Sequence, residues 1–175
     1  HAYDEVKMVL VCNREQSREV EYAFELPHIW SADHTVRYLA QTKEEVQELF
    51  GRIDESLRER ETLLEEGAPR IPHYVFFILD RRLTEDAPLM RILLQADNQV
   101  GVSADFVEEK FASIPKECTA IIQNDQDVCG IYVKNENDNR FLQFHADSFP
   151  LSQMEACTSQ ISRIPVRTER AQLSV

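Results

Sequence analysis

The stretch HYVFFILDRRL, residues 73–83, places a carboxylate where it could take part in chemistry. Five apolar residues, 75–79, predict a strand that is buried on both faces. Asp80 follows at the carboxyl end of this strand, and ligands bind at that end in open parallel sheets. An aspartate in this position could hold the magnesium ion of a bound nucleoside triphosphate.

A phosphate-binding loop, which such a nucleotide site also needs, is not encoded. Only glycine lets several successive backbone N–H groups curl around an anion. The glycines of this chain are too far apart to form either GxxxxGK[ST] or GxGxxG. They are Gly51, Gly67, Gly101 and Gly130. We therefore expect no phosphate cradle.

Composition and charge limit the function classes that remain. The 175 residues are 43% apolar and 29% charged, and they predict one domain over 1–165 with a frayed tail or linker over 166–175. A formal net charge of −12 disfavours direct binding to nucleic acids and anionic lipids. No apolar run approaches the roughly 20 residues of a membrane span, so we expect neither membrane insertion nor a signal peptide.

The cysteine and histidine residues of this sequence do not have the spacing of known metal-binding motifs. The four cysteines form no CxxC pair, so we interpret them as reduced, partly buried thiols rather than as metal ligands or disulfides. They are Cys12, Cys118, Cys129 and Cys157. His28, Asp33 and His34 could form a metal cluster, but their spacing matches no known ligand pattern.

Short apolar runs predict strands along the whole chain. They cover 7–12, 35–40, 73–80, 102–107, 118–123, 128–133 and 140–146. A long helix is predicted over 42–66, with Thr42 and Glu45 as a capping box and its end at Gly67 and Pro69. Its apolar face would consist of Val46, Leu49, Phe50, Ile53, Leu57 and Leu64.

Two further helices complete the predicted elements. Thr84 or Asp86 could cap the first, and Ser152 with Glu155 forms a capping box for a last helix that runs to about Ile164. Strands that alternate with helices through the first five strands indicate βαβ units. The predicted fold is α/β, a mostly parallel sheet with helices on both faces and a late antiparallel hairpin at its edge.

Several stretches, in the right order, resemble the FtsK/SpoIIIE-type ATPases of type VII secretion systems, the EssC and EccC proteins. HAYDEVK, Tyr22, LPHIW at 26–30 and Arg37 are similar to stretches of their membrane-proximal, degenerate ATPase-like domain. The matched residues of LPHIW include Pro27, His28 and Trp30. HYVFFILD takes the place of the Walker B strand, followed by GVSADFV, IPKECTAII and FHADSF. The resemblance implies a RecA/FtsK-like degenerate NTPase fold.

This sequence departs from the family's pattern in two places. The family's domain has a segment before the His1 position that carries the phosphate loop, so the chain resembles an N-terminally truncated fragment. Active members place a glutamate after the Walker B aspartate to polarise water, and Arg81 stands there instead. Without the phosphate-loop strand, 74–80 should pair directly with 101–107 or, failing that, leave apolar edges that pair between two molecules.

The resemblance implies a non-catalytic role in protein secretion. The chain would be a domain of a membrane-anchored ATPase, on the cytoplasmic side of the bacterial membrane, that serves in coupling and assembly. It would hold no cofactor itself, whereas the parent protein would use ATP and magnesium in other modules. Its partners would be those modules and other components of the secretion machine. Two alternatives stay open: an ATP site completed by an upstream phosphate loop, and an independent acidic interaction module.

The individual residues are open to structural and functional interpretations, and we favour the structural ones. Asp80 could be a relic magnesium ligand, or it could accept hydrogen bonds from the loop that it begins. His28 and Trp30 could form a recognition surface, but a lone tryptophan beside Pro27 more often packs across the end of a sheet. The charged outer face of 42–66 could dock a partner or simply be solvated.

Overall fold

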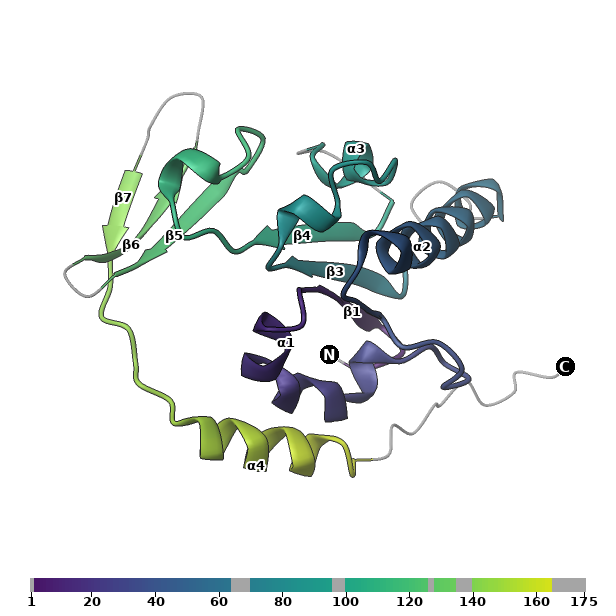
Figure 1. Cartoon of the computed structure of the whole chain (residues 1–175), viewed down its shortest axis with the longest axis horizontal. Helices are drawn as coiled ribbons and strands as arrows, with labels where there is room; N and C mark the ends of the chain where they lie inside the picture. The colour runs from purple at the N-terminus through teal and green to yellow at the C-terminus, as the bar shows by residue number, and fades with distance from the viewer. Residues whose placement is uncertain (1, 64–69, 96–99, 126–127, 135–139, 165–175) are drawn as a thin grey trace, which may run out of the picture.

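The chain folds into a four-stranded parallel sheet with helices on both faces and a separate three-stranded antiparallel sheet (Figure 1). The computed structural model describes residues 2–63, 70–95, 100–125, 128–134 and 140–164. The α/β class is as predicted. The antiparallel strands differ from the prediction, because they form a sheet of their own and do not extend the edge of the parallel one.

The four-stranded sheet has the order β2-β1-β3-β4, and all its strands are parallel. Its strands are β1 Val6–Val11, β2 Leu39–Ala40, β3 His73–Ile78 and β4 Val102–Phe106. The second sheet has the order β5-β6-β7. Its strands are β5 Ala120–Asn124, β6 Cys129–Val133 and β7 Arg140–Gln143.

The helices divide into α-helices and short 3-10 helices. The α-helices are α1 Gln16–Glu19, α2 Lys43–Leu63, α3 Met90–Leu93 and α4 Leu151–Ile161. The 3-10 helices are η1 Glu21–Glu25, η2 Pro27–Ile29, η3 Arg81–Leu83 and η4 Phe111–Ser113. None of the described helices is long and apolar enough to cross a bilayer.

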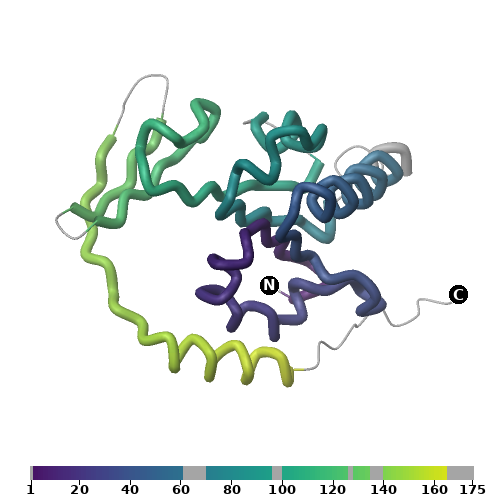
Figure 2. Tube along the Cα trace, viewed as in Figure 1, coloured from purple at the N-terminus to yellow at the C-terminus, as the bar shows by residue number. Residues whose placement is uncertain are grey.

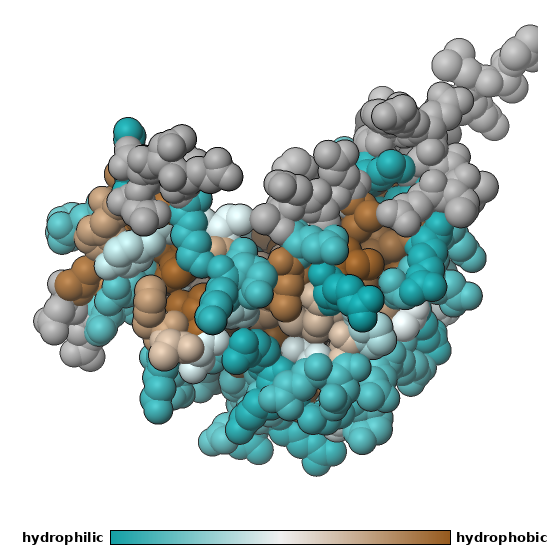
Figure 3. Space-filling view, turned by 90° about the horizontal axis from the view of Figure 1, so that it is seen from above, coloured by the Kyte–Doolittle hydropathy of each residue, from teal (hydrophilic) through white to brown (hydrophobic). Residues whose placement is uncertain are grey.

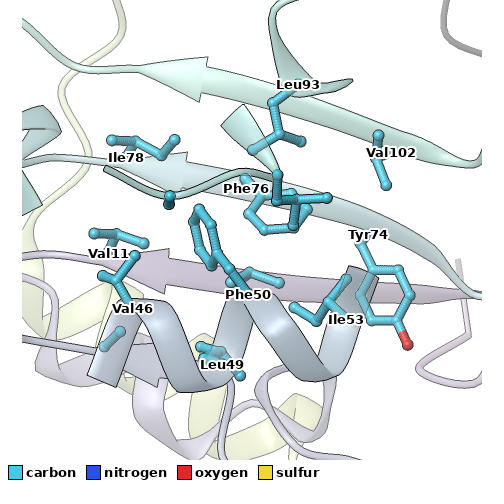
Figure 4. Close-up of a cluster of buried hydrophobic side chains, with 14 of the residues drawn as sticks. Val11, Val46, Leu49, Phe50, Ile53, Tyr74, Phe76, Ile78, Leu93 and Val102 are labelled. Atoms are coloured by element: carbon cyan, nitrogen blue, oxygen red, sulfur yellow. The ribbon is translucent and has the colours of Figure 1, made fainter. Parts of the chain in front are cut away.

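Strand alternation gives the four-stranded sheet two packed faces. Val9 and Val11 lie on the face covered by α2 and α3, where Phe50 meets Phe76 edge to face with ring centroids 5.2 Å apart (Figure 4). This is the larger core, and burial of its apolar surface supplies most of the packing energy. Leu10 and Cys12 point to the opposite face and pack against η1 and η2.

The long helix begins at the predicted cap Thr42, but Glu45 reaches back to Gln41, one residue before the cap, and not to Thr42 itself. The Glu45 N–H donates to Thr42 Oγ1 at 3.2 Å, and Glu45 Oε2 accepts from the Gln41 N–H at 2.6 Å. Five of the six predicted apolar residues, Val46 to Leu57, are buried in the core. The sixth, Leu64, and the predicted stop at Gly67 and Pro69 lie outside the described residues.

Three local predictions are wrong. The strand expected over 35–40 is only Leu39–Ala40, because Arg37 bridges to Trp30 instead. The last helix begins after Pro150, which makes no side-chain cap, so the expected capping box at Ser152 is not its start. Neither Thr84 nor Asp86 caps α3, whose four residues follow Leu89 at the N-cap position.

The direct pairing of 74–80 with 101–107 is confirmed. β3 and β4 are parallel neighbours, in register from Tyr74 opposite Val102 to Ile78 opposite Phe106. β3 lies between β1 and β4, and Phe76 and Ile78 are buried on the face toward α2. The other face is less buried than predicted, because Val75, Phe77 and Leu79 are only half-buried.

The end of the described chain returns to the parallel sheet. After β7, residues 144–150 form a connection without helix or strand that leads from the second sheet to α4 (Figures 1 and 2). α4 contacts η1, on the side of the parallel sheet. The second sheet is therefore joined to the first through the residues before β5 and again through α4. The predicted boundary of a single domain at 165 stays a prediction, and the tail 166–175 lies outside the described residues.

Candidate functional site at the carboxyl end of the parallel sheet

The order β2-β1-β3-β4 has a topological switch point between β1 and β3. From β1 the chain moves outward to β2, then crosses to the other side of β1 and continues through β3 to β4. Ligands of open α/β sheets bind in the crevice at the carboxyl ends of the strands at this point. Asn13 follows β1 there, and Asp80 follows β3.

Asp80 is 6% exposed, and hydrogen bonds occupy both of its oxygens. Oδ1 accepts from the Arg82 N–H at 3.2 Å and from Arg82 Nε at 2.9 Å. Oδ2 accepts from Arg82 Nη2 at 2.8 Å and from Asn13 Nδ2 at 3.0 Å. The bond to the backbone of η3 is the loop-turning contact that the structural interpretation expects.

These contacts favour the ionised carboxylate. The Arg82 hydrogen bonds, and after them the bond from Asn13, hold the pKa of Asp80 below its ordinary value, although burial acts in the opposite direction. Arg82 remains mostly solvent-exposed, so it neutralises the carboxylate from the outer side of the crevice.

Asn13 and Gln16 hydrogen-bond the loop after β1 to the loop after β3, and we call this set of bonds the closure of the switch point. Neither residue was singled out from the sequence. Asn13 Oδ1 accepts from the N–H groups of Glu15 and Gln16, at 2.9 and 3.0 Å, and so fixes the turn before α1. Gln16 Nε2 donates to the Leu79 carbonyl at 2.9 Å. The available signal was positional, because a polar side chain stands two residues after the end of each strand of the switch-point pair.

Arg81, which follows Asp80 in the chain, pairs with a carboxylate beyond the end of β4. Its Nε lies 3.4 Å from Glu108 Oε1, beyond the end of β4. Its carbonyl accepts from the buried hydroxyl of Thr84 at 2.8 Å, which closes the η3 turn. Arg81 thus ties the loop after β3 to the loop after β4.

A groove of about 900 Å³ lies at this end of the sheet, and the loops after β1, β3 and β4 line it. Acidic groups dominate its lining, and none of the lining residues is a glycine. The acidic ones are Glu15, Glu19, Asp80, Glu85, Glu108 and Glu109. The basic ones are Arg81, Arg82 and Lys110. A polyphosphate would meet net negative charge there without a backbone cradle, so the groove does not fit ATP.

Magnesium, which the resemblance connects with the Asp80 position, does not fit this arrangement either. A metal ligand needs a free carboxylate oxygen, and the hydrogen bonds from Arg82 and Asn13 occupy both. Across the described part of the chain, no group of three or more His, Cys, Asp or Glu side chains is placed to hold a metal ion.

Pro27, His28, Trp30 and Arg37 gather at a second place, on the face of the sheet opposite α2. The Arg37 guanidinium lies 4.4 Å from the Phe24 ring centroid and 5.4 Å from that of Trp30. Arg37 Nη2 donates to the Phe24 carbonyl at 3.4 Å. The stacked guanidinium thus holds η1, through Phe24, against the segment that follows η2.

Trp30 packs against the core, as the structural interpretation expects, but on a face of the sheet and not across its end. Trp30 is half-buried against the smaller core, which contains Leu10 and Ile29, and its ring lies 6.1 Å from that of His34. His28 contacts Tyr3 edge to face at 6.5 Å, and burial, with Lys7 nearby, lowers the pKa of His28. The histidines thus point to separate aromatic partners.

Asp33 serves a turn in place of the metal site that its neighbours suggested. Its carboxylate accepts from the hydroxyls of Ser31 and Thr35 at 2.5 and 2.8 Å. These bonds lower the pKa of Asp33 to about 2. The three residues shape the loop in which His34 adopts a positive φ of 56°.

One relative supports the resemblance seen in the sequence. The chain is 26% identical over 124 residues to the ESX secretion system protein EccC of Geobacillus thermodenitrificans (strain NG80-2). The match covers 70% of this chain but only 8% of the relative. No protein-family profile matches the chain. The relation to EccC proteins is therefore supported at a distant level.

Proposed function

We propose that this chain is a non-hydrolysing module of an ESX-type, type VII secretion protein, with a role in assembly and coupling. The distant similarity to EccC supports the secretion role. The match spans a small part of that relative, so the module would act within a longer polypeptide.

The observation that carries the non-hydrolysing part is the closure of the switch point. Asp80, the residue in the Walker B position, directs both oxygens to Arg82 and Asn13. Arg81 pairs with Glu108, where an active enzyme would need a group that polarises water. Asp80 and Arg81, which stand where groups that act on a nucleotide would lie, instead join the loop after β3 to the loops after β1 and β4.

Partners and location follow from this role. The module would contact other ATPase modules of the same polypeptide and other parts of the secretion machine, on the cytoplasmic side of the bacterial membrane. Neither nucleic acid nor direct membrane insertion is part of the proposal. The charge of −12 supports this choice, since it repels phosphate backbones and anionic lipids.

Calorimetry with magnesium-ATP tests the non-hydrolysing part. The isolated chain should bind with a dissociation constant in the millimolar range or weaker, and Asp80→Asn should not change it. A low micromolar constant that Asp80→Asn abolishes would overturn the proposal and favour a genuine ATP site.

The secretion role needs a test in the parent protein. A strain without the parent gene is complemented with the intact gene or with one lacking residues 2–164. The shortened protein should lose export into the medium while the purified protein retains ATP hydrolysis by its other modules. Normal export with the shortened protein would refute the coupling role.

A further inference from the structure

The outer edge of β4 presents unpaired backbone groups. The Tyr74 N–H donates to the Gly101 carbonyl at 2.9 Å, and the Val107 N–H donates to the Ile78 carbonyl at 3.0 Å. Since backbone direction alternates along a strand, Ser103 and Asp105 also bond to β3. The N–H and C=O groups of 102, 104 and 106 therefore point away from the sheet, and no described backbone group bonds to them.

A pocket of about 180 Å³ lies along this edge. Its apolar wall comes from α3 and β4, and Glu117 and Thr119, before β5, form the opposite wall. The apolar members are Leu93, Leu94, Val102, Ala104 and Phe106. Seen from above, apolar residues reach the surface between the parallel sheet and the second sheet (Figure 3). The open edge thus faces a hollow that is wide enough for a side chain.

We propose that the β4 edge binds an extended segment of a partner protein, in which apolar and basic residues alternate. The segment adds a fifth strand to the parallel sheet through main-chain hydrogen bonds with 102, 104 and 106. This inference goes beyond the proposed function and does not depend on it.

The two sides of β4 determine the alternation. Residues of an added strand that face α3 lie against the apolar wall of the pocket, beside Leu93 and Phe106, and this wall favours apolar side chains, whereas Glu117 and Thr119 opposite are polar. The residues between them face the side of Asp105, which is exposed. Glu109, just beyond the strand, is exposed as well, so a lysine or arginine on that side gains favourable charge contacts.

Charge also argues against a second copy of this chain at the edge. Two copies bring together net charges of −12 each. Antiparallel pairing of β4 with its own copy would place the two Asp105 carboxylates on neighbouring strands, and like charges there are destabilising. A basic partner has the complementary sign.

Amide hydrogen exchange, followed by NMR on labelled chain, tests the proposal. The probe is a short acetylated peptide of alternating lysine and valine. In the free chain the amides of Ser103 and Asp105 should be protected, while those of Val102, Ala104 and Phe106 exchange rapidly. Saturating peptide should slow these three by about tenfold or more. Binding without that change would overturn strand addition.

Matched peptides and variants separate the contribution of main-chain hydrogen bonds to binding from that of charge. A lysine–valine peptide in which every residue is N-methylated keeps the charge but loses its main-chain donors whichever way the strand runs, and it should bind at least about tenfold more weakly. Ala104→Pro removes one outward N–H at an edge position that tolerates proline, and should weaken binding similarly. Asp105→Asn keeps the backbone and should weaken binding less.

Three further results would refute the inference. They are equal binding of the N-methylated peptide, equal binding of a glutamate–valine peptide, and protection of the three amides that rises with protein concentration alone. The last would identify a second copy as the occupant. The ATP titration of the isolated chain is independent, so failure here leaves the proposed function standing.

Discussion

Asn13 Nδ2 lies 3.0 Å from Asp80 Oδ2, and this hydrogen bond joins the carboxyl ends of β1 and β3. Asp80→Ala should therefore lower the free energy of unfolding by about 2 kcal/mol, because it leaves a part-buried amide and a backbone N–H without a charged acceptor. Urea denaturation measures the change.

Asp86→Ala is the matched control for that substitution. Asp86 is an aspartate in the same loop, 72% exposed, and its ion pair with Lys43 at 3.6 Å is a surface contact. Its loss should cost at most about 0.5 kcal/mol. If both variants were equally stable, the closure of the switch point would contribute nothing measurable.

The contribution of Asp80 should depend on pH with a defined sign. Its pKa in the folded chain lies below the ordinary value because of Arg82 and then Asn13. The ionised form therefore stabilises the fold above the unfolded pKa of about 3.9, and this stability is lost as pH falls through the folded pKa. The difference between the wild-type chain and Asp80→Ala should be constant near neutral pH and shrink below about pH 4. A difference that grew on acidification would contradict the assignment.

Arg37 should be replaceable only poorly by lysine. Its planar guanidinium stacks on Phe24 and Trp30, a geometry that an ammonium cannot reproduce. Arg37→Lys should destabilise by about 1 kcal/mol and Arg37→Ala by more. Trp30 is the only tryptophan in the chain, so its fluorescence follows the site directly. Unchanged emission in both variants would show that the stacking does not persist in solution.

The thiols should differ in reactivity. Cys12 is fully buried, and burial raises its pKa to about 11, whereas Cys157 is exposed. Iodoacetamide at neutral pH should modify Cys157 first and Cys12 only in denaturant, because the thiolate is the reactive form. Peptide mapping by mass spectrometry reads both sites. Early labelling of Cys12 would indicate that η1 and η2 open readily from the sheet.

The elements that were predicted well have strong local signals. The helix that contains Phe50 combines a capping box with a regular apolar face, and β3 is a continuous apolar run. β2 was overpredicted, because TVRYLA has the composition of a strand while Arg37 is held by Trp30 and Phe24. These contacts join Arg37 to residues that lie outside TVRYLA in the sequence, so the local pattern of TVRYLA does not reveal them.

The candidate site was predicted only in part for the same reason. Asp80 was located from the end of its strand, and its turn contact follows from its residue type. Asn13 and Gln16 are as ordinary in the sequence as any polar residue after a strand. Their role appears only when strand order brings β1 beside β3, 67 residues apart along the chain at the Asn13–Asp80 bond.

The return of α4 to η1 has a mechanical consequence. α4 buries only Thr158, so its attachment is slight compared with the paired strands of either sheet. Tension applied at the end of α4 would peel this helix away first, because small contacts open at lower free energy than strand ladders. Residues 144–150 would then extend as slack. The contact between α4 and η1 would therefore open before the strands of the parallel sheet separate.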